Sequence, residues 1–165
     1  PATDTQSALS PPEDLPQTTA AEPPSPVYEE EAPLFAGLDE AARTIVVSND
    51  DFGSWLSELY VNMERYEGYT IVTTGYVFKD PAFIQDGEFV PARLMMSCCA
   101  ADLVPVGLLC HYDEASQLEA DSWVTVEGTL FIAQIEYEGQ SYDDPQLKVT
   151  KVTPAQAVEG YVYPY

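Results

Sequence analysis

Two long β-rich runs, each interrupted by a glycine, constrain the fold of this chain more than any other feature. Residues 69–79 (YTIVTTGYVFK) contain Gly75, and residues 122–134 (SWVTVEGTLFIAQ) contain Gly128. Alternating apolar and polar residues indicate strands with one buried face, and a glycine inside a strand marks a bulge or a sharp bend. The two runs therefore predict strongly coiled strands of the kind that a small barrel requires.

Three shorter β-rich runs complete the pattern, at residues 89–97, 104–112 and 146–152. Between the third and fourth strands, residues 113–119 can form one helical turn. Five strands with a helical connection at that point predict a mainly β domain, an OB-like five-stranded barrel. An SH3-like barrel or a β-sandwich remains the alternative.

One amphipathic helix is predicted before the first strand of the barrel. Its apolar residues recur at the spacing of an α-helix and are Phe52, Trp55, Leu56, Leu59, Tyr60 and Met63. The cluster Ser48-Asn49-Asp50-Asp51 supplies N-cap residues, so the helix should run from about Asp51 to Arg65 and end near Gly68. A short β-branched run, residues 45–47, precedes this cluster.

The same patterns predict which side chains share the core. We expect the helix face formed by Trp55, Leu56 and Leu59 to pack against the strands. The core residues expected from the strands are Ile71, Val72, Tyr76, Leu108, Trp123, Val126 and Phe131.

The first 43 residues differ in composition from the rest of the chain. Eight of the fourteen prolines fall within the first 33 residues, and residues 1–42 carry nine acidic residues but no Lys or Arg. Such a segment cannot bury enough apolar surface to offset the entropy cost of ordering it. We therefore expect residues 1–43 to be a disordered acidic Pro-rich stalk or linker, and residues 44–165 to form the barrel domain.

The charge of the chain argues against nucleic acid as a ligand. Six Lys and Arg face 28 Asp and Glu, a net charge of −22, and residues 43–165 hold six basic against nineteen acidic residues. Affinity for nucleic acids comes largely from basic residues that displace counterions from phosphates. Exposed aromatic residues on an OB-like barrel can stack bases, so a nucleic-acid binder is an alternative that the charge disfavours.

Three cysteines and one histidine are the residues best suited to chemistry. Cys98 and Cys99 are adjacent and Asp102 follows them, while Cys110 and His111 lie in the third predicted strand. A bridge between adjacent cysteines is strained because their Cα atoms lie only about 3.8 Å apart. Three thiols without an obvious pairing indicate buried apolar cysteines, a redox site or a soft-metal site.

A soft-metal or metalloid site requires Cys98, Cys99 and Asp102 to converge, with Cys110 or His111 as weaker candidate ligands. Adjacent side chains on an extended backbone point to opposite faces, so both thiols can bind one ion only where the chain turns. A closed four-ligand zinc site is not expected, since the chain has no CxxC pair and one histidine.

An enzyme is not expected either. If residues 98–103 connect the second and third strands, Cys110 lies at the far end of the hairpin, opposite roughly Ala92. A cysteine nucleophile needs a positioned base, but the side chains of Cys110 and His111 should alternate away from each other in a strand.

Several short motifs occur in a fixed order between the helix and the end of the chain. They are residues 75–77 (GYV), Arg93, residues 96–102 (MSCCAAD), residues 105–107 (PVG), residues 123–128 (WVTVEG) and residues 161–163 (YVY). The CCAAD block followed by a W-V-x-V-x-G strand is the most specific combination. With these motifs, the chain resembles the C-terminal domain of the YcgQ-type family of two-component permease subunits.

The resemblance implies a membrane-anchored protein with a hydrophobic N-terminal portion, then a spacer, then this domain on the extracytoplasmic side. Its implied partner is a polytopic permease of a class related to organoarsenical exporters. The membrane segments are absent from the given chain, which holds no run of roughly 20 apolar residues and is expected to be soluble. The domain would then be a non-catalytic accessory or interaction domain, centred on Cys98, Cys99, Asp102 and Arg93.

Overall fold

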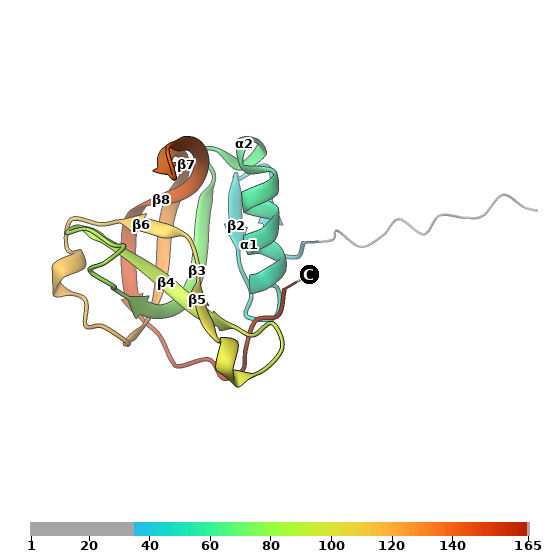
Figure 1. Ribbon diagram of the computed structural model, residues 1–165. Coiled ribbons are helices and arrows are strands. Elements are labelled where there is room, and N and C mark those ends of the chain that lie inside the picture. The colour runs from blue at the N-terminus through green and yellow to red at the C-terminus, as the bar shows by residue number, and fades with distance from the viewer. Residues whose placement is uncertain (1–34, 165) are drawn as a thin grey trace, which may run out of the picture. The chain divides into compact units, whose positions relative to one another are not determined.

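A computed structural model describes residues 35–164 of the chain (Figure 1). The chain divides into two units, residues 1–32 and 33–165, and the described residues belong to the second. The stalk is predicted for residues 1–43, and residues 1–34 of it lie outside the described residues. Within residues 35–164, no helix combines the length and the apolar character that crossing a bilayer demands.

Five strands close into a barrel with OB-like topology. They are β3 (Thr70–Phe78), β4 (Glu88–Met95), β6 (Leu109–His111), β7 (Trp123–Tyr137) and β8 (Gln140–Pro154). Antiparallel ladders join β3 to β4, β4 to β6, β7 to β8 and β3 to β7, and a parallel ladder between β6 and β8 closes the ring. This arrangement confirms the predicted OB-like five-stranded barrel rather than the SH3-like or sandwich alternative.

The glycines inside β3 and β7 permit close approach between strands, and Gly128 lies at a predicted bulge. A Cβ atom at Gly75 would lie 2.4 Å from the carbonyl carbon of Pro91 in β4. Gly128 lies at a register shift between Glu127 and Gly128, and a Cβ there would lie 3.0 Å from the carbonyl oxygen of Lys148. Any larger residue would push the strands apart at these points.

The predicted third strand is divided into two. β5 (Val104–Val106) and β6 both pair with β4, and Gly107 with Leu108 separates them. A Cβ at Gly107 would lie 2.8 Å from the carbonyl oxygen of Pro91, so the chain bends there against β4. The helical turn expected after this strand is the 3₁₀ helix η2 (Ala115–Gln117).

The helix before the barrel is confirmed, but it is broken. α1 (Phe52–Val61) and α2 (Met63–Tyr66) are separated at Asn62, whose φ is −121°. The side-chain amide of Asn62 donates to the carboxylate of Glu58 at 3.0 Å. Side chains four residues apart face each other on a helix, so this bond supports the last turn of α1, where the backbone N–H of Asn62 also donates to Glu58.

Regular structure begins before the predicted boundary at residue 44. β1 (Leu38–Asp39) pairs antiparallel with β2 (Thr44–Val46), and β2 runs parallel to β3. β2 includes Ile45 and Val46 of the short β-branched run and widens the sheet beyond the barrel (Figure 1).

Residues 35–43 also cover the buried face of α1. The ring of Phe35 lies 4.8 Å from that of Trp55, and the Trp55 indole donates to the carbonyl oxygen of Ala36 at 2.9 Å. A buried indole requires both apolar cover and a hydrogen-bond acceptor, and this segment supplies them. The acidic composition of the segment gave no sign of this role.

The core lies inside the barrel and beneath α1. Of the predicted core residues, Trp55, Leu59, Ile71, Leu108 and Val126 are buried. The remaining ones are only half-buried: Leu56, Val72, Tyr76, Trp123 and Phe131.

Trp123 is therefore not the core residue that the sequence predicted. Trp123 and Val126 are three positions apart in one strand, so they point to opposite faces, and Val126 is the one inside. Trp123 instead lies on the outer face, with its ring 6.0 Å from that of Tyr76.

The β7–β8 hairpin is longer than predicted. β7 continues to Tyr137 and β8 begins at Gln140, and these two residues pair with each other. The turn residues Glu138 and Gly139 both have positive φ, 50° and 77°. Two positive φ values characterise a two-residue hairpin turn, which favours a glycine. Gly139 was the signal for this turn in the sequence.

Candidate functional site

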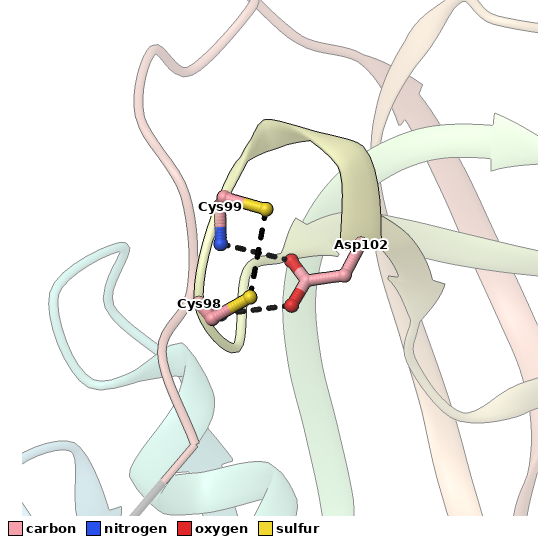
Figure 2. Close-up of side chains that lie close together, drawn as sticks. All are labelled: Cys98, Cys99 and Asp102. Atoms are coloured by element: carbon pink, nitrogen blue, oxygen red, sulfur yellow. Dashed lines mark hydrogen bonds between the residues drawn. The ribbon is translucent and has the colours of Figure 1, made fainter.

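The connection between β4 and β5 carries the two exposed cysteines. The chain leaves β4, turns through Cys98 and Cys99, and enters a 3₁₀ helix, η1 (Ala100–Asp102), before β5. Cys98, Cys99 and Asp102 lie together in this connection and are termed the dithiol turn (Figure 2).

Asp102 gives the turn its shape. Its Oδ2 accepts a hydrogen bond from the backbone N–H of Cys98 at 2.8 Å, and its Oδ1 accepts from Ser97 and Cys99 at 3.3 Å each. The Cys99 side chain accepts from the backbone N–H of Asp102, which completes a capping box. The three-residue spacing from Cys99 to Asp102 is the signal for this box in the sequence.

The turn brings the adjacent thiols to one side. An extended backbone would separate them, but here the two Sγ atoms lie 3.5 Å apart. One ligand atom from each of Cys98, Cys99 and Asp102 lies within 4.8 Å of the other two. Figure 2 shows both sulfur atoms and the carboxylate facing the space enclosed by the turn.

The two thiols differ in acidity. Hydrogen bonds from the backbone N–H of Ala101 and from the Cys98 thiol lower the pKa of Cys99. The Asp102 carboxylate and Cys99 raise the pKa of Cys98. Hydrogen bonds from Cys98 lower the pKa of Asp102. Because each thiol acts on the proton of the other, the two titrate as a pair beside a carboxylate.

Cys110 lies apart from the dithiol turn, inside the barrel. It is 0% exposed, and its thiol donates to the carbonyl oxygen of Leu108 at 3.6 Å. Cys110 is opposite Phe89 and not Ala92 as predicted, because β4 ends at Met95 opposite Val104, earlier than expected, and the same register continues from β5 through β6. Burial raises the pKa of this thiol, which opposes metal ligation and alkylation.

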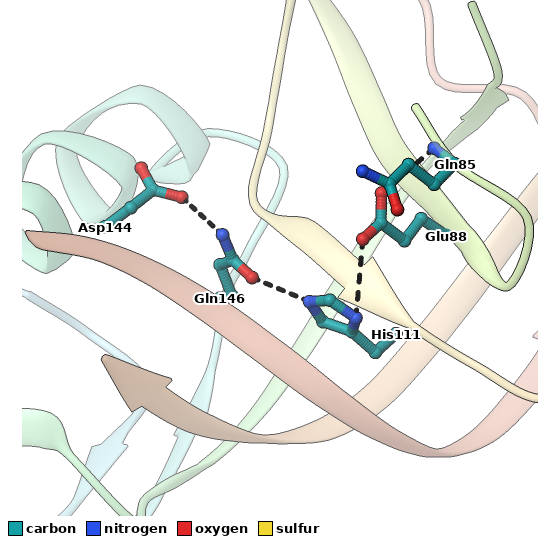
Figure 3. Close-up of polar contacts among 5 residues, drawn as sticks. All are labelled: Gln85, Glu88, His111, Asp144 and Gln146. Carbon is teal, nitrogen blue, oxygen red and sulfur yellow. Dashed lines mark hydrogen bonds and ion pairs between the residues drawn. The ribbon is translucent and has the colours of Figure 1, made fainter. Parts of the chain in front are cut away.

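His111 points to the other face of β6 and joins a separate polar network (Figure 3). Its Nδ1 lies 3.6 Å from the carboxylate of Glu88, and its Nε2 lies 2.6 Å from the side-chain oxygen of Gln146. Gln146 donates in turn to Asp144 at 2.9 Å. The described contacts of His111 reach β4, β8 and, through the ring of Phe131, β7, and they include no thiol.

Arg93, also a predicted site residue, lies on β4 and is 5% exposed. Its Nη1 donates to the side-chain oxygen of Asn49 at 3.1 Å and to the carbonyl oxygen of Thr74 at 3.3 Å. Its guanidinium carbon lies over the rings of Phe52 and Trp123, at 5.3 and 5.5 Å. Sequence reasoning missed these neighbours, because they come from segments far apart in the chain.

An OB-like barrel with an exposed dithiol turn defines a small β-barrel domain with a candidate thiol site. The chain belongs to the DUF1980 C-terminal domain family, whose model matches residues 25–164. The UPF0703 protein YcgQ of Bacillus subtilis (strain 168) is 26% identical over 137 residues, which cover 82% of this chain and 47% of that protein. These findings confirm the YcgQ-type family. The chain spans about half the length of this curated relative.

Among solved structures, the chain is similar to a small single-stranded DNA-binding protein from Streptomyces coelicolor. The TM-score is 0.34 and the identity 16%, with 53% of this chain and 94% of that chain covered. This similarity is too low to support an argument about function.

Proposed function

We propose that this domain is a non-catalytic accessory domain of a membrane permease system and that it binds a soft metal or metalloid ion at the dithiol turn. The supporting observation is the approach of two thiol sulfurs and a carboxylate to within 4.8 Å in an exposed turn. Thiolates are the ligands that soft and borderline ions prefer. The lowered pKa of Cys99 favours this chemistry, because a cysteine must lose its proton to bind a metal ion.

The spacing of the sulfur atoms favours particular ions. Two sulfurs 3.5 Å apart and about 2.3 Å from a shared ion subtend about 100° at that ion. Tetrahedral Zn(II) and pyramidal trivalent arsenic accept such an angle. A linear dithiolate complex of Cu(I) needs sulfurs about 4.6 Å apart at the same bond length, so the turn would have to open.

The number of donors suits transfer of an ion better than permanent storage. Structural zinc sites close with four protein ligands, whereas sites with three keep one position open. The dithiol turn offers three donors at the surface. A donor from a partner protein could occupy the fourth position and take over the ion.

The permease partner and the extracytoplasmic location rest on the family resemblance. In that arrangement, membrane segments outside the given chain anchor the domain, and the polytopic permease is the recipient or source of the ion. The net charge of −22 supports an ion-binding role over nucleic-acid binding, because an acidic surface attracts cations and repels phosphate.

Ion binding is tested on the full chain, purified in reduced form without oxygen. Calorimetric titration should show one Zn(II) or one trivalent arsenic bound per chain, with weaker binding of Cu(I). The double variant Cys98→Ser, Cys99→Ser should lose this binding, whereas the matched control Cys110→Ser should retain it. Failure of the wild-type chain to bind any of the three ions, or equal binding by the double variant, would contradict the proposal.

The partner is tested separately in membranes that contain the full-length protein. A photo-crosslinking residue in place of Val104, which is exposed on β5 beside the turn, should capture a polytopic permease identified by mass spectrometry. The same group in place of Tyr137, exposed at the tip of the β7–β8 hairpin, is the control. Equal capture at both positions, or none at either, would exclude a permease docked at the dithiol turn.

A further inference from the structure

A second candidate site lies beside Arg93, away from the cysteines. A pocket of about 230 Å³ opens between the start of α1 and residues 158–163 near the end of the chain. This terminal segment is held to the barrel at Val162, whose N–H donates to Leu94 and whose carbonyl accepts from Met96, both at 2.9 Å. The pocket therefore has two fixed walls.

Arg93 supplies a positioned positive charge to this pocket. The guanidinium is held by its bonds to Asn49 and Thr74 and by the rings of Phe52 and Trp123. These contacts use Nη1 and the face of the group. Among the hydrogen bonds of residues 35–164, none involves Nη2 or Nε of Arg93, so donors remain for a ligand.

The charge of Arg93 has no carboxylate partner among the described residues. The ion pairs of residues 35–164 are Arg65 with Glu40, His111 with Glu88, and Lys151 with Glu127. A charge that is 95% buried is costly unless an opposite charge accompanies it. The planar fork of a guanidinium matches a carboxylate in two parallel hydrogen bonds.

The first turn of α1 adds to this preference for an anion. Gly53 of that turn lines the same pocket, and the N-terminus of α1 has no side-chain cap. Unbonded N–H groups at a helix start carry partial positive charge. The guanidinium and the helix start thus act on the same space.

The rim of the pocket is acidic. Asp50 and Glu159 line it, and both residues are exposed. A ligand with a second negative charge would be repelled, whereas an ammonium group would be favoured. The volume of about 230 Å³ fits a small metabolite better than a nucleotide or a peptide.

We propose that this pocket binds a small zwitterion of the α-amino acid type. Its carboxylate lies on the fork of Arg93 near the N-terminus of α1, and its ammonium group faces Asp50 and Glu159. This inference is independent of the dithiol turn, because it uses none of the cysteines.

The test is calorimetric titration of the full chain with glycine, alanine and serine, and with propionate and ethylamine as matched single-charge compounds. At least one amino acid should bind at least tenfold more tightly than either single-charge compound. Arg93→Lys, which keeps the charge but not the fork, should weaken the amino acid at least tenfold. The surface variant Arg65→Lys is the control and should bind as the wild type does.

A variant that leaves the buried residue intact keeps the test valid if Arg93→Lys does not fold. Asp50→Asn with Glu159→Gln, both at the exposed rim, should reduce the preference for the amino acid over propionate. The double variant Cys98→Ser, Cys99→Ser should bind the amino acid unchanged. The proposal is overturned if no amino acid binds, if Arg93→Lys binds equally well, or if propionate binds as tightly as the amino acids.

Discussion

The dithiol turn and the interior of the barrel place the same residue type in opposite environments. Cys98 and Cys99 are exposed, and backbone and thiol hydrogen bonds lower the pKa of Cys99. Cys110 is fully buried, and desolvation raises the pKa of its thiol. Location therefore decides whether a cysteine in this domain is an accessible thiol or an apolar side chain that fills the core.

The largest expected difference is in alkylation rate. Cys99 should react with iodoacetamide in the folded state, and its rate should fall as pH is lowered through its depressed pKa, because the thiolate is lost. Cys110 should react only after unfolding, which for a typical stability of 5–15 kcal/mol lowers its rate by a factor of at least about 1,000. Peptide mapping by mass spectrometry measures both rates. Comparable rates for Cys99 and Cys110 in the native protein would remove the contrast.

Truncating a buried side chain should lower the free energy of unfolding far more than truncating an exposed one. Phe89 is 0% exposed and lies opposite Cys110, so Phe89→Ala should lower the free energy of unfolding by about 3–5 kcal/mol. Phe83 is 81% exposed, and Phe83→Ala should change it by less than about 0.5 kcal/mol. Urea denaturation gives both values, and a small loss for Phe89→Ala would mean that the barrel interior is poorly packed.

A smaller effect is expected when the thiols themselves become hydroxyls. Cys110→Ser buries a polar group and should cost about 1–3 kcal/mol of unfolding free energy. Cys98→Ser leaves the new hydroxyl in water and should stay within about 0.5 kcal/mol of the wild type. Thermal and urea unfolding of the two variants compare them directly. An equal loss of unfolding free energy in the two variants would show that the difference in exposure between Cys98 and Cys110 has no effect on stability.

The smallest expected effect lies within the dithiol turn. Cys98→Ala removes the thiol that donates to Cys99, so the pKa of Cys99 should rise towards its ordinary value. The backbone N–H of Ala101 is the larger cause of the lowering and remains, so the pKa of Cys99 should stay below its ordinary value. The pH profile of Cys99 alkylation measures it. An unchanged profile would mean that the two thiols do not interact in solution.

Local patterns in the sequence predicted much of this fold. The alternation in β3 and β7, the glycines inside them and the helical spacing from Phe52 onward depend on residues close together in the chain. The same reasoning grouped Cys98, Cys99 and Asp102, because their spacing allows a turn to bring them together. It misplaced Trp123, since the choice of inner face in a strand depends on what the other strands present.

Local sequence patterns predict the positions of the five barrel strands, the bends at their glycines and the acidic charge that disfavours nucleic acid. The folded chain alone reveals which thiols are exposed, that Cys110 lies opposite Phe89, and that Arg93 lies between aromatic rings without a carboxylate partner among residues 35–164. Periodicity and turn signals act over a few residues. Burial, pKa and charge pairing instead depend on segments that come together only when the barrel closes.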